Sequence, residues 1–137
     1  MRFMVIMKAN ADSESSAPPP PGTFEAMGAY NQQLLDAGVL LAGEGLLPSS
    51  RGARVDFTGD APAVIEGPFP ETDQLVAGFW IIQTASREEA IDWVKRCPYQ
   101  GENPIEVRQI AELEDFGDAV TPEVRAHEER MRDQLEG

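Results

Sequence analysis

The sequence predicts an α+β domain with the split βαβ arrangement of ferredoxin-like domains and one inserted hairpin. The first observation is that a strand–helix–strand pattern occurs twice along the chain, with one helix in each half. The second is a hairpin signal, two short strand-like runs around Gly59 and Asp60, which lies between the two halves. The third is size, because 137 residues with 42% hydrophobic residues suit one domain with a buried core.

The first half begins with an apolar run over residues 3–7, which predicts a central strand covered on both faces. Residues 12–22 contain four consecutive prolines and predict a mobile surface loop without helix or strand. Thr23 is suited to cap a helix that ends near residues 36–37, with Gly38 as its stop. The predicted apolar face of this helix consists of Phe24, Met27, Leu34 and Leu35, with Asn31 in its middle and Tyr30 at its edge. Residues 39–46 then predict a second strand.

The second half follows the hairpin, whose strands are expected at residues 53–58 and 63–66. Residues 75–84 predict a long apolar strand in which Phe79 and Trp80 must point to opposite faces. One ring should join the core under the helices, and the other should face the second sheet of a dimer. A Ser-Arg-Glu-Glu capping box then starts a helix that Pro98 ends, and residues 105–110 alternate as a half-exposed strand.

The remaining residues form an acidic extension, so we divide the chain into a domain at 1–117 and a C-terminal helix at 118–137. Thr121 and Pro122 begin this helix, which carries only a thin apolar stripe: Val124, Met131 and Leu135. Residues 111–137 hold nine acidic and three basic side chains. We expect the helix to dock on the body or on a partner.

Composition excludes several classes of function. Eleven Lys and Arg against 24 Asp and Glu give a net charge of −13, which argues against binding nucleic acid or a membrane surface. Cys97 and His127 are the sole cysteine and histidine, so we expect no disulfide, no metal site and no other cofactor. Cys97 is interpreted as inert core, and His127 as surface or interface packing. No apolar run approaches the length of a membrane span and no signal peptide is evident, so a cytoplasmic protein is expected.

Glu44 is the first candidate for a catalytic residue. It lies within a hydrophobic strand between Gly43 and Gly45, where a carboxyl group with a raised pKa can serve as an acid or base. The alternative is that Glu44 simply pairs with Arg54 or Arg108 and holds the sheet together.

The candidate ligand-binding residues are Tyr30, Asn31, Arg54, Phe69, Glu71 and Arg108. The two arginines suit a carboxylate ligand, which a guanidinium binds in a bidentate manner, although internal salt bridges explain them equally well. Asn31 either orients a ligand or bonds a backbone edge, the interpretation we favour. Phe69 either covers the mouth of a pocket or anchors its own loop on the core, while Glu71 braces that loop.

One proline-rich segment has a distinctive order, Glu66-Gly67-Pro68-Phe69 followed by Pro70-Glu71-Thr72. Seven further segments accompany it: residues 30–31, 37–40, 43–46, 48–55, 78–80, 86–90 and 105–108. In these segments the chain resembles the YCII-related family, in particular the branch named for an Asp-Gly-Pro-Phe motif, to which Glu66-Gly67-Pro68-Phe69 corresponds. The resemblance covers roughly residues 1–116 and leaves the C-terminal helix outside.

This resemblance implies a ferredoxin-like fold that pairs into a dimeric α+β barrel, with a cleft between sheet and helices as the site. The chain departs from the family pattern at Glu66, where the motif has Asp, and at Asp73 and Gln74, which replace a common Lys-Glu pair. The His-Asp pair proposed to be catalytic in other YCII-type proteins has no histidine counterpart in the body of this chain.

Three functions follow as hypotheses. The leading one is a homodimeric protein that binds a small, anionic or neutral molecule in a pocket bounded by the first helix, the Glu44 strand and the Phe69 loop. The second is a cofactor-free lyase or isomerase in which Glu44 moves protons and Arg54 or Arg108 holds an anionic substrate. The third is a regulatory or assembly module that acts through the C-terminal helix.

Overall fold

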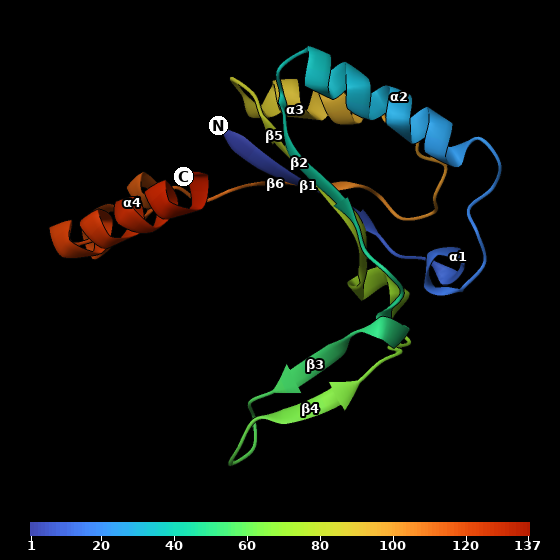
Figure 1. Ribbon diagram of the computed structural model, residues 1–137, viewed down its shortest axis with the longest axis horizontal. Coiled ribbons are helices and arrows are strands. Elements are labelled where there is room, and N and C mark those ends of the chain that lie inside the picture. The colour runs from blue at the N-terminus through green and yellow to red at the C-terminus, as the bar shows by residue number, and fades with distance from the viewer.

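The computed structural model describes residues 1–137 and joins four strands in one antiparallel sheet. Their spatial order is β2 (Leu40–Gly45), β5 (Val76–Gln83), β1 (Arg2–Lys8) and β6 (Glu106–Gln109). Helices α2 (Thr23–Asp36) and α3 (Arg87–Val94) cover one face of this sheet (Figure 1). Each helix connects two strands that are not neighbours in the sheet, which is the split βαβ arrangement. The predicted ferredoxin-like α+β fold is confirmed.

The core lies between the sheet and the two helices. Because alternate side chains of a strand point to opposite faces, Phe3 and Val5 of β1 are buried under the helices together with Trp80 and Ile82 of β5. Their neighbours point to the opposite face, which no helix covers; this open face is formed by Met4, Ile6, Phe79 and Ile81. The predicted opposite orientation of Phe79 and Trp80 is confirmed. Strand β1 is central as predicted, but helices cover only one of its faces.

The ends of α2 differ in how well the sequence predicts them. Gly38 has a positive φ of 75° and follows the last turn, as expected of a helix stop. At the other end Gly22, with φ of 87°, takes the N-cap position that we predicted for Thr23, so Thr23 is the first helical residue. A side-chain cap is absent there, because glycine has no side chain to accept a hydrogen bond.

The buried side of α2 also differs from the predicted face. Tyr30 and Leu34 are buried, whereas Phe24 and Leu35 are exposed. Tyr30 can lie in the core because its ring packs edge-on against Trp80, with centroids 5.8 Å apart, and its hydroxyl donates to the carbonyl oxygen of Trp93 at 2.8 Å. The helical wheel places Tyr30 at the edge of the apolar face and does not reveal this partner.

Residues 12–22 are not wholly irregular, contrary to our prediction. Asn10 caps a single helical turn, α1 (Ala11–Glu14), by accepting from the Ser13 amide, and Ser13 accepts in return from the Asn10 amide. This reciprocal capping box offsets the weak helix propensity of the segment. Helix α3, in the second half of the chain, is shorter than predicted. It ends at Val94, and residues 95–97 form a turn and a bend before Pro98.

The inserted hairpin consists of β3 (Ala53–Asp56) and β4 (Ala63–Glu66), which pair only with each other. It extends away from the sheet and helices (Figure 1). Its strands match the predicted ones, except that β3 ends two residues earlier than expected.

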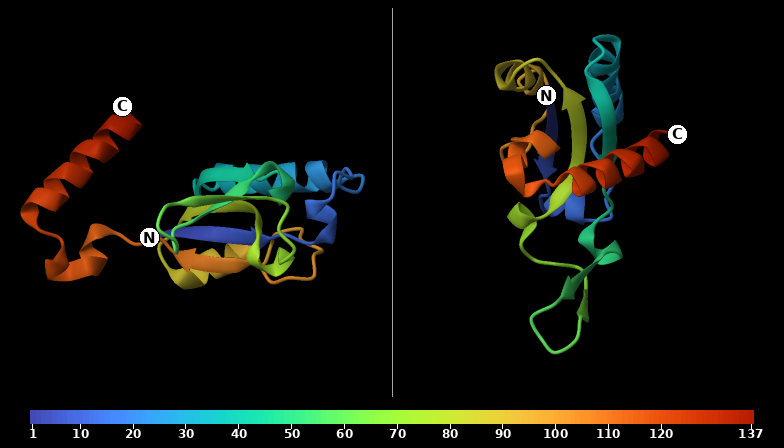
Figure 2. Two further views of the ribbon diagram at one scale, coloured as in Figure 1. Left: turned by 90° about the horizontal axis from the view of Figure 1, so that it is seen from below. Right: turned by 90° about the vertical axis from the view of Figure 1, so that its left-hand side faces the viewer.

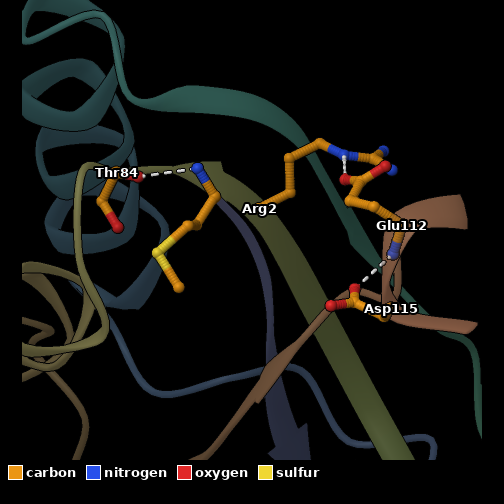
Figure 3. Close-up of polar contacts among 5 residues, drawn as sticks. Arg2, Thr84, Glu112 and Asp115 are labelled. Carbon is orange, nitrogen blue, oxygen red and sulfur yellow. Dashed lines mark hydrogen bonds and ion pairs between the residues drawn. The ribbon is translucent and has the colours of Figure 1, made fainter. Parts of the chain in front are cut away.

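The C-terminal extension leaves the body after β6. A tight helical segment, Leu113–Ala119, precedes α4 (Pro122–Glu136), which Thr121 caps as predicted. Figure 3 shows the attachment: Arg2 of β1 bonds Glu112 at 2.9 Å, and the amide of Glu112 donates to Asp115 at 2.8 Å. No residue of α4 is buried, and the helix projects from the body (Figure 2). None of the helices combines the length and the apolar character that crossing a membrane requires.

Candidate functional site

A cleft opens where the end of β2 meets the turn before β3 and the loop that carries Phe69. We call it the Phe69 cleft; its volume is about 420 Å³. It is lined by Glu14, Gly45, Leu46, Leu47, Pro48, Ser49, Arg51, Gly52, Ala53, Phe69, Leu75 and Val76. The wall is therefore half apolar, with one carboxylate, one hydroxyl and one guanidinium among its side chains. Such a mixture is typical of small-molecule sites.

Ser49 holds three segments together in the wall of this cleft. Its hydroxyl donates to the carboxylate of Glu14 and accepts from the amide of Phe69 at 2.9 Å. The amide of Ser49 also donates to Glu14, at 2.8 Å. Glu14, the last residue of α1, is thereby fixed against the turn at residues 49–51 and the Phe69 loop. These bonds give the cleft a defined shape.

Three of the predicted ligand-binding residues come together at the edge of the cleft. The guanidinium carbon of Arg54 lies 3.8 Å from the centroid of the Phe69 ring, a cation–π contact. Arg54 also faces Glu71, with Nη1 and Oε2 3.7 Å apart. Phe69 itself is buried, so its ring anchors the loop and at the same time supports the arginine. That Phe69 covers the mouth of a ligand pocket stays a prediction.

The arginine that lines the cleft itself, Arg51, was not among our candidates. Arg51 lines the cleft, and the five ion pairs of the chain do not include it. Arg51 and Ser49 fall within the matching segment 48–55, so the sequence contained a signal for them. Glu14 had none, because it lies in the segment that we predicted to be a mobile loop and contacts Ser49 across 35 positions of the sequence.

The motif glycine explains how the loop fits so closely. The amide of Gly67 donates to the carbonyl oxygen of Gly52 at 3.0 Å. A Cβ atom on Gly67 would lie 1.8 Å from the carbonyl oxygen of Ser49, far inside van der Waals contact. Only glycine permits this approach between the loop and the turn, so the Glu66-Gly67-Pro68-Phe69 segment sets the shape of the cleft wall.

Tyr30 and Asn31 lie outside this cleft. The side-chain oxygen of Asn31 accepts from the indole nitrogen of Trp80 at 2.7 Å, so its partner is a side chain and not the backbone edge that we favoured. Tyr30 donates to Trp93, and burial raises the pKa of its hydroxyl to about 12, with Cys97 adding to the rise and Arg96 opposing it. Both residues are occupied in holding α2 to the sheet and to α3.

Glu44 and Arg108 belong to the open-face side of the sheet. Glu44 lies opposite Phe79 in the register of β2 and β5, is exposed, and lines neither the Phe69 cleft nor the groove beside α3 described below. Arg108 lies opposite Met4 and pairs with Glu106 at 3.2 Å. Glu44 is in no ion pair, so the predicted pairing with Arg54 or Arg108 is wrong. Arg54 pairs instead with Glu71, and Arg108 pairs with Glu106. The predicted residues thus divide among three places: the Phe69 cleft, the core and the open face.

A larger groove of about 570 Å³ lies between α3 and the segment that leads into β6. Its wall includes Cys97, whose thiol pKa burial raises to about 11. The thiol is therefore protonated at neutral pH, which suits an inert residue and not a nucleophile. Because this groove contains none of the candidate residues, the Phe69 cleft is the stronger candidate site.

Comparison with known proteins places this chain within a family. The sequence profile of the YCII-related domain matches residues 1–114, which include the Phe69 cleft and exclude α4. An uncharacterised protein of Rhizobium meliloti (strain 1021) is 30% identical over 69 residues, or 50% of this chain and 56% of that protein. The chain thus spans just over half the length of this curated relative. On the extent of the domain match, the chain belongs to the YCII-related family.

Proposed function

We propose that this protein binds a small anionic molecule, such as a carboxylate, in the Phe69 cleft. One observation carries the proposal: Arg51 lines a cleft whose wall is half apolar, Arg54 lies at its edge, and neighbouring carboxylates do not neutralise these two arginines fully. Arg51 is in no ion pair, and the contact between Arg54 and Glu71 is long, at 3.7 Å, with both side chains more than 40% exposed. An exposed pair of this kind is weak, so a bound carboxylate can displace Glu71 at little cost.

The selectivity for anions follows from the geometry of guanidinium groups. Arg54 is already oriented, since its flat face rests on Phe69 and its edge remains directed outward to solvent and Glu71. A planar edge of this kind binds a carboxylate through two parallel hydrogen bonds. The apolar lining, which includes Leu46, Leu47 and Val76, would bury the hydrocarbon part of the ligand.

Thermal-shift screening against small carboxylates tests this proposal, because a ligand that binds the folded state raises the Tm. We expect at least one acid to raise the Tm of the wild type and to lose most of that effect with Arg54→Gln. Arg87→Gln is the matched control, because Arg87 also faces a glutamate at a long distance, 3.8 Å, but lies on α3. Equal shifts in all three proteins, or none with any acid, would contradict the proposal.

A second candidate, a cofactor-free lyase or isomerase, rests on Glu44. This carboxylate has no cationic partner and lies opposite Phe79 on the open-face side of the sheet. If two sheets pair in a dimeric barrel, Glu44 lies at the rim of the space between them. Glu44→Gln would then abolish turnover and leave both the Tm and the carboxylate-induced shift unchanged.

A third candidate is assembly through α4, which lies beyond the matched family region and has no buried residue. We treat residues 118–137 as an extension of the domain at 1–117 on the same grounds.

The proposed homodimer would form through the open face, whose four apolar side chains are only partly covered.

A further inference from the structure

The hairpin carries an apolar face that the chain leaves uncovered. Val55 and Val64 lie opposite each other across β3 and β4, and Phe57 comes directly after the end of β3, two residues beyond Val55. Their exposed fractions are 50%, 65% and 73%. We call these three residues the arm face. On the other side of the hairpin Arg54 reaches back to Phe69, whereas the arm face has no such partner within the chain.

An isolated hairpin with such a face requires a cover. Two strands alone are at best marginally stable in water, and clustered exposed apolar side chains mark an interaction surface more often than scattered ones. Every residue of the two strands is exposed except Asp56, which is half-buried. The chain itself offers little packing that would hold the hairpin in place.

The position of the hairpin indicates what covers it. The hairpin and α4 both leave the body on the side of the sheet that faces away from α2 and α3 (Figure 1). Seen from that side, α4 comes toward the viewer and the hairpin extends beyond the end of the strands (Figure 2, right). The open face and the hairpin therefore border the same space (Figure 1), and each carries apolar side chains that the chain leaves partly or largely exposed.

We propose that the β3–β4 hairpin is a dimer arm that packs its arm face against a second copy seated on the open face. The proposal rests on the homodimer of the proposed function and adds the element that clasps it. A second copy fits better than an unrelated protein, because in a two-fold pair each chain supplies both an open face and an arm. The arm of one chain then lies against its partner, and the reverse contact is identical.

Sedimentation equilibrium of arm variants tests the energetic part. We expect Phe57→Asp to raise the dimer dissociation constant at least tenfold, since it places a charge in an apolar contact. Phe24→Asp is a closely matched control: Phe24 is also 73% exposed but lies on α2, behind the sheet. Circular dichroism should show both variants folded. Equal dissociation constants for Phe57→Asp and the wild type overturn the proposal, as does a monomeric wild type.

A photo-crosslinking residue at position 57 tests the position of the arm. In a mixture of isotopically light and heavy chains, we expect crosslinked pairs in which one peptide comes from a light chain and the other from a heavy chain. Crosslinks only within one chain, to α4 or to the chain's own sheet, would show that the arm folds back and would overturn the proposal. Absence of any interchain product has the same meaning.

These outcomes separate the arm from the ligand site. Position 57 does not line the Phe69 cleft, so the carboxylate-induced rise in Tm should persist in Phe57→Asp. If the dimer and crosslinking tests fail but the thermal shift is preserved, the arm is refuted and the binding function is not. If the tests of the arm succeed but no acid shifts the Tm, the binding function is refuted and the arm is not.

Discussion

At the scale of single residues, Gly67 has the most stringent requirement in the chain. A Cβ atom there would lie 1.8 Å from the carbonyl oxygen of Ser49 and 3.2 Å from that of Gly52. We expect Gly67→Ala to lower the free energy of unfolding by about 1–3 kcal/mol, the usual cost of overpacking. Urea denaturation measures this loss. It should be accompanied by a weaker carboxylate-induced thermal shift, because the turn and the Phe69 loop must separate.

Gly45→Ala is the control for this prediction. Gly45 lines the same cleft from the end of β2, and a Cβ atom there meets nothing within 4 Å. Its unfolding free energy should stay within about 0.5 kcal/mol of the wild type, as for an ordinary surface substitution. If the two variants are equally stable, the loop does not pack as the structure indicates.

The ionisable groups of the buried Tyr30 and the half-buried Cys97 lead us to expect that the free energy of unfolding decreases at alkaline pH. Burial raises the pKa of Cys97 from 9.0 to about 11 and that of Tyr30 from 10.0 to about 12. In the unfolded chain both groups lose their protons at lower pH than in the folded chain, so the unfolded state binds fewer protons above pH 9. Their contribution to stability is complete below pH 9 and is lost as the pH rises towards 12.

The measurement compares urea unfolding at pH 8 and pH 11 for the wild type and Cys97→Ala. We expect the variant to lose less stability than the wild type between these two values, since it lacks one of the titrating groups. Subtracting the change in unfolding free energy of Cys97→Ala from that of the wild type removes the contribution of the other groups that titrate between pH 8 and pH 11. A larger loss in Cys97→Ala would contradict the assignment.

At the scale of elements, local patterns predicted what local physics determines. Strand alternation placed Phe79 and Trp80 on opposite faces, Thr121 capped α4, and Gly38 ended α2, because each signal acts within a few residues. The half-buried state of Met4 and Ile6 could not be read in the same way. An apolar run predicts a strand covered on both faces, but it does not say whether the chain itself or a second molecule covers the second face.

The candidate site shows the same division. Arg54, Phe69 and Glu71 were predicted and do come together, since they lie on or next to a hairpin whose register the sequence indicates. Glu14 was missed because its role depends on Ser49, a contact across 35 positions that no local pattern contains. Glu44, the first choice from sequence, lies outside the cleft because strand alternation turns it to the face opposite the helices.

Helix α4 supports a prediction at this scale. None of its residues is buried, and its ion pair to the preceding segment, Arg125 with Glu114, is exposed, so it contributes little to the stability of the body. We expect deletion of residues 120–137 to change the unfolding free energy by less than about 1 kcal/mol, measured with urea. The carboxylate-induced thermal shift should also remain. A large destabilisation would show that α4 packs on the body in solution.

At the scale of the whole molecule, two opposing forces decide whether the chain pairs. The open face presents four apolar side chains, whose removal from water favours association by about 25 cal/mol per Å² of apolar surface. Each chain also carries a net charge of −13, and two such chains repel each other over distances comparable to the Debye length. That length falls from about 30 Å at 0.01 M salt to about 8 Å at 0.15 M. Salt should therefore promote pairing.

We accordingly expect light scattering to give twice the chain mass of 15.0 kDa at 0.15 M salt, with a dissociation constant that increases as the salt is diluted. Ile81→Glu should leave a folded monomer, because it adds a charge in the middle of the open face, where burial without a partner is costly. Leu35→Glu, on the exposed side of α2, should pair like the wild type. A dimer that weakens with added salt would instead indicate that ion pairs, such as those available to Arg2 and Arg108, outweigh the apolar contact. A monomer at every salt concentration would mean that the open face faces solvent, and the barrel would have to be abandoned.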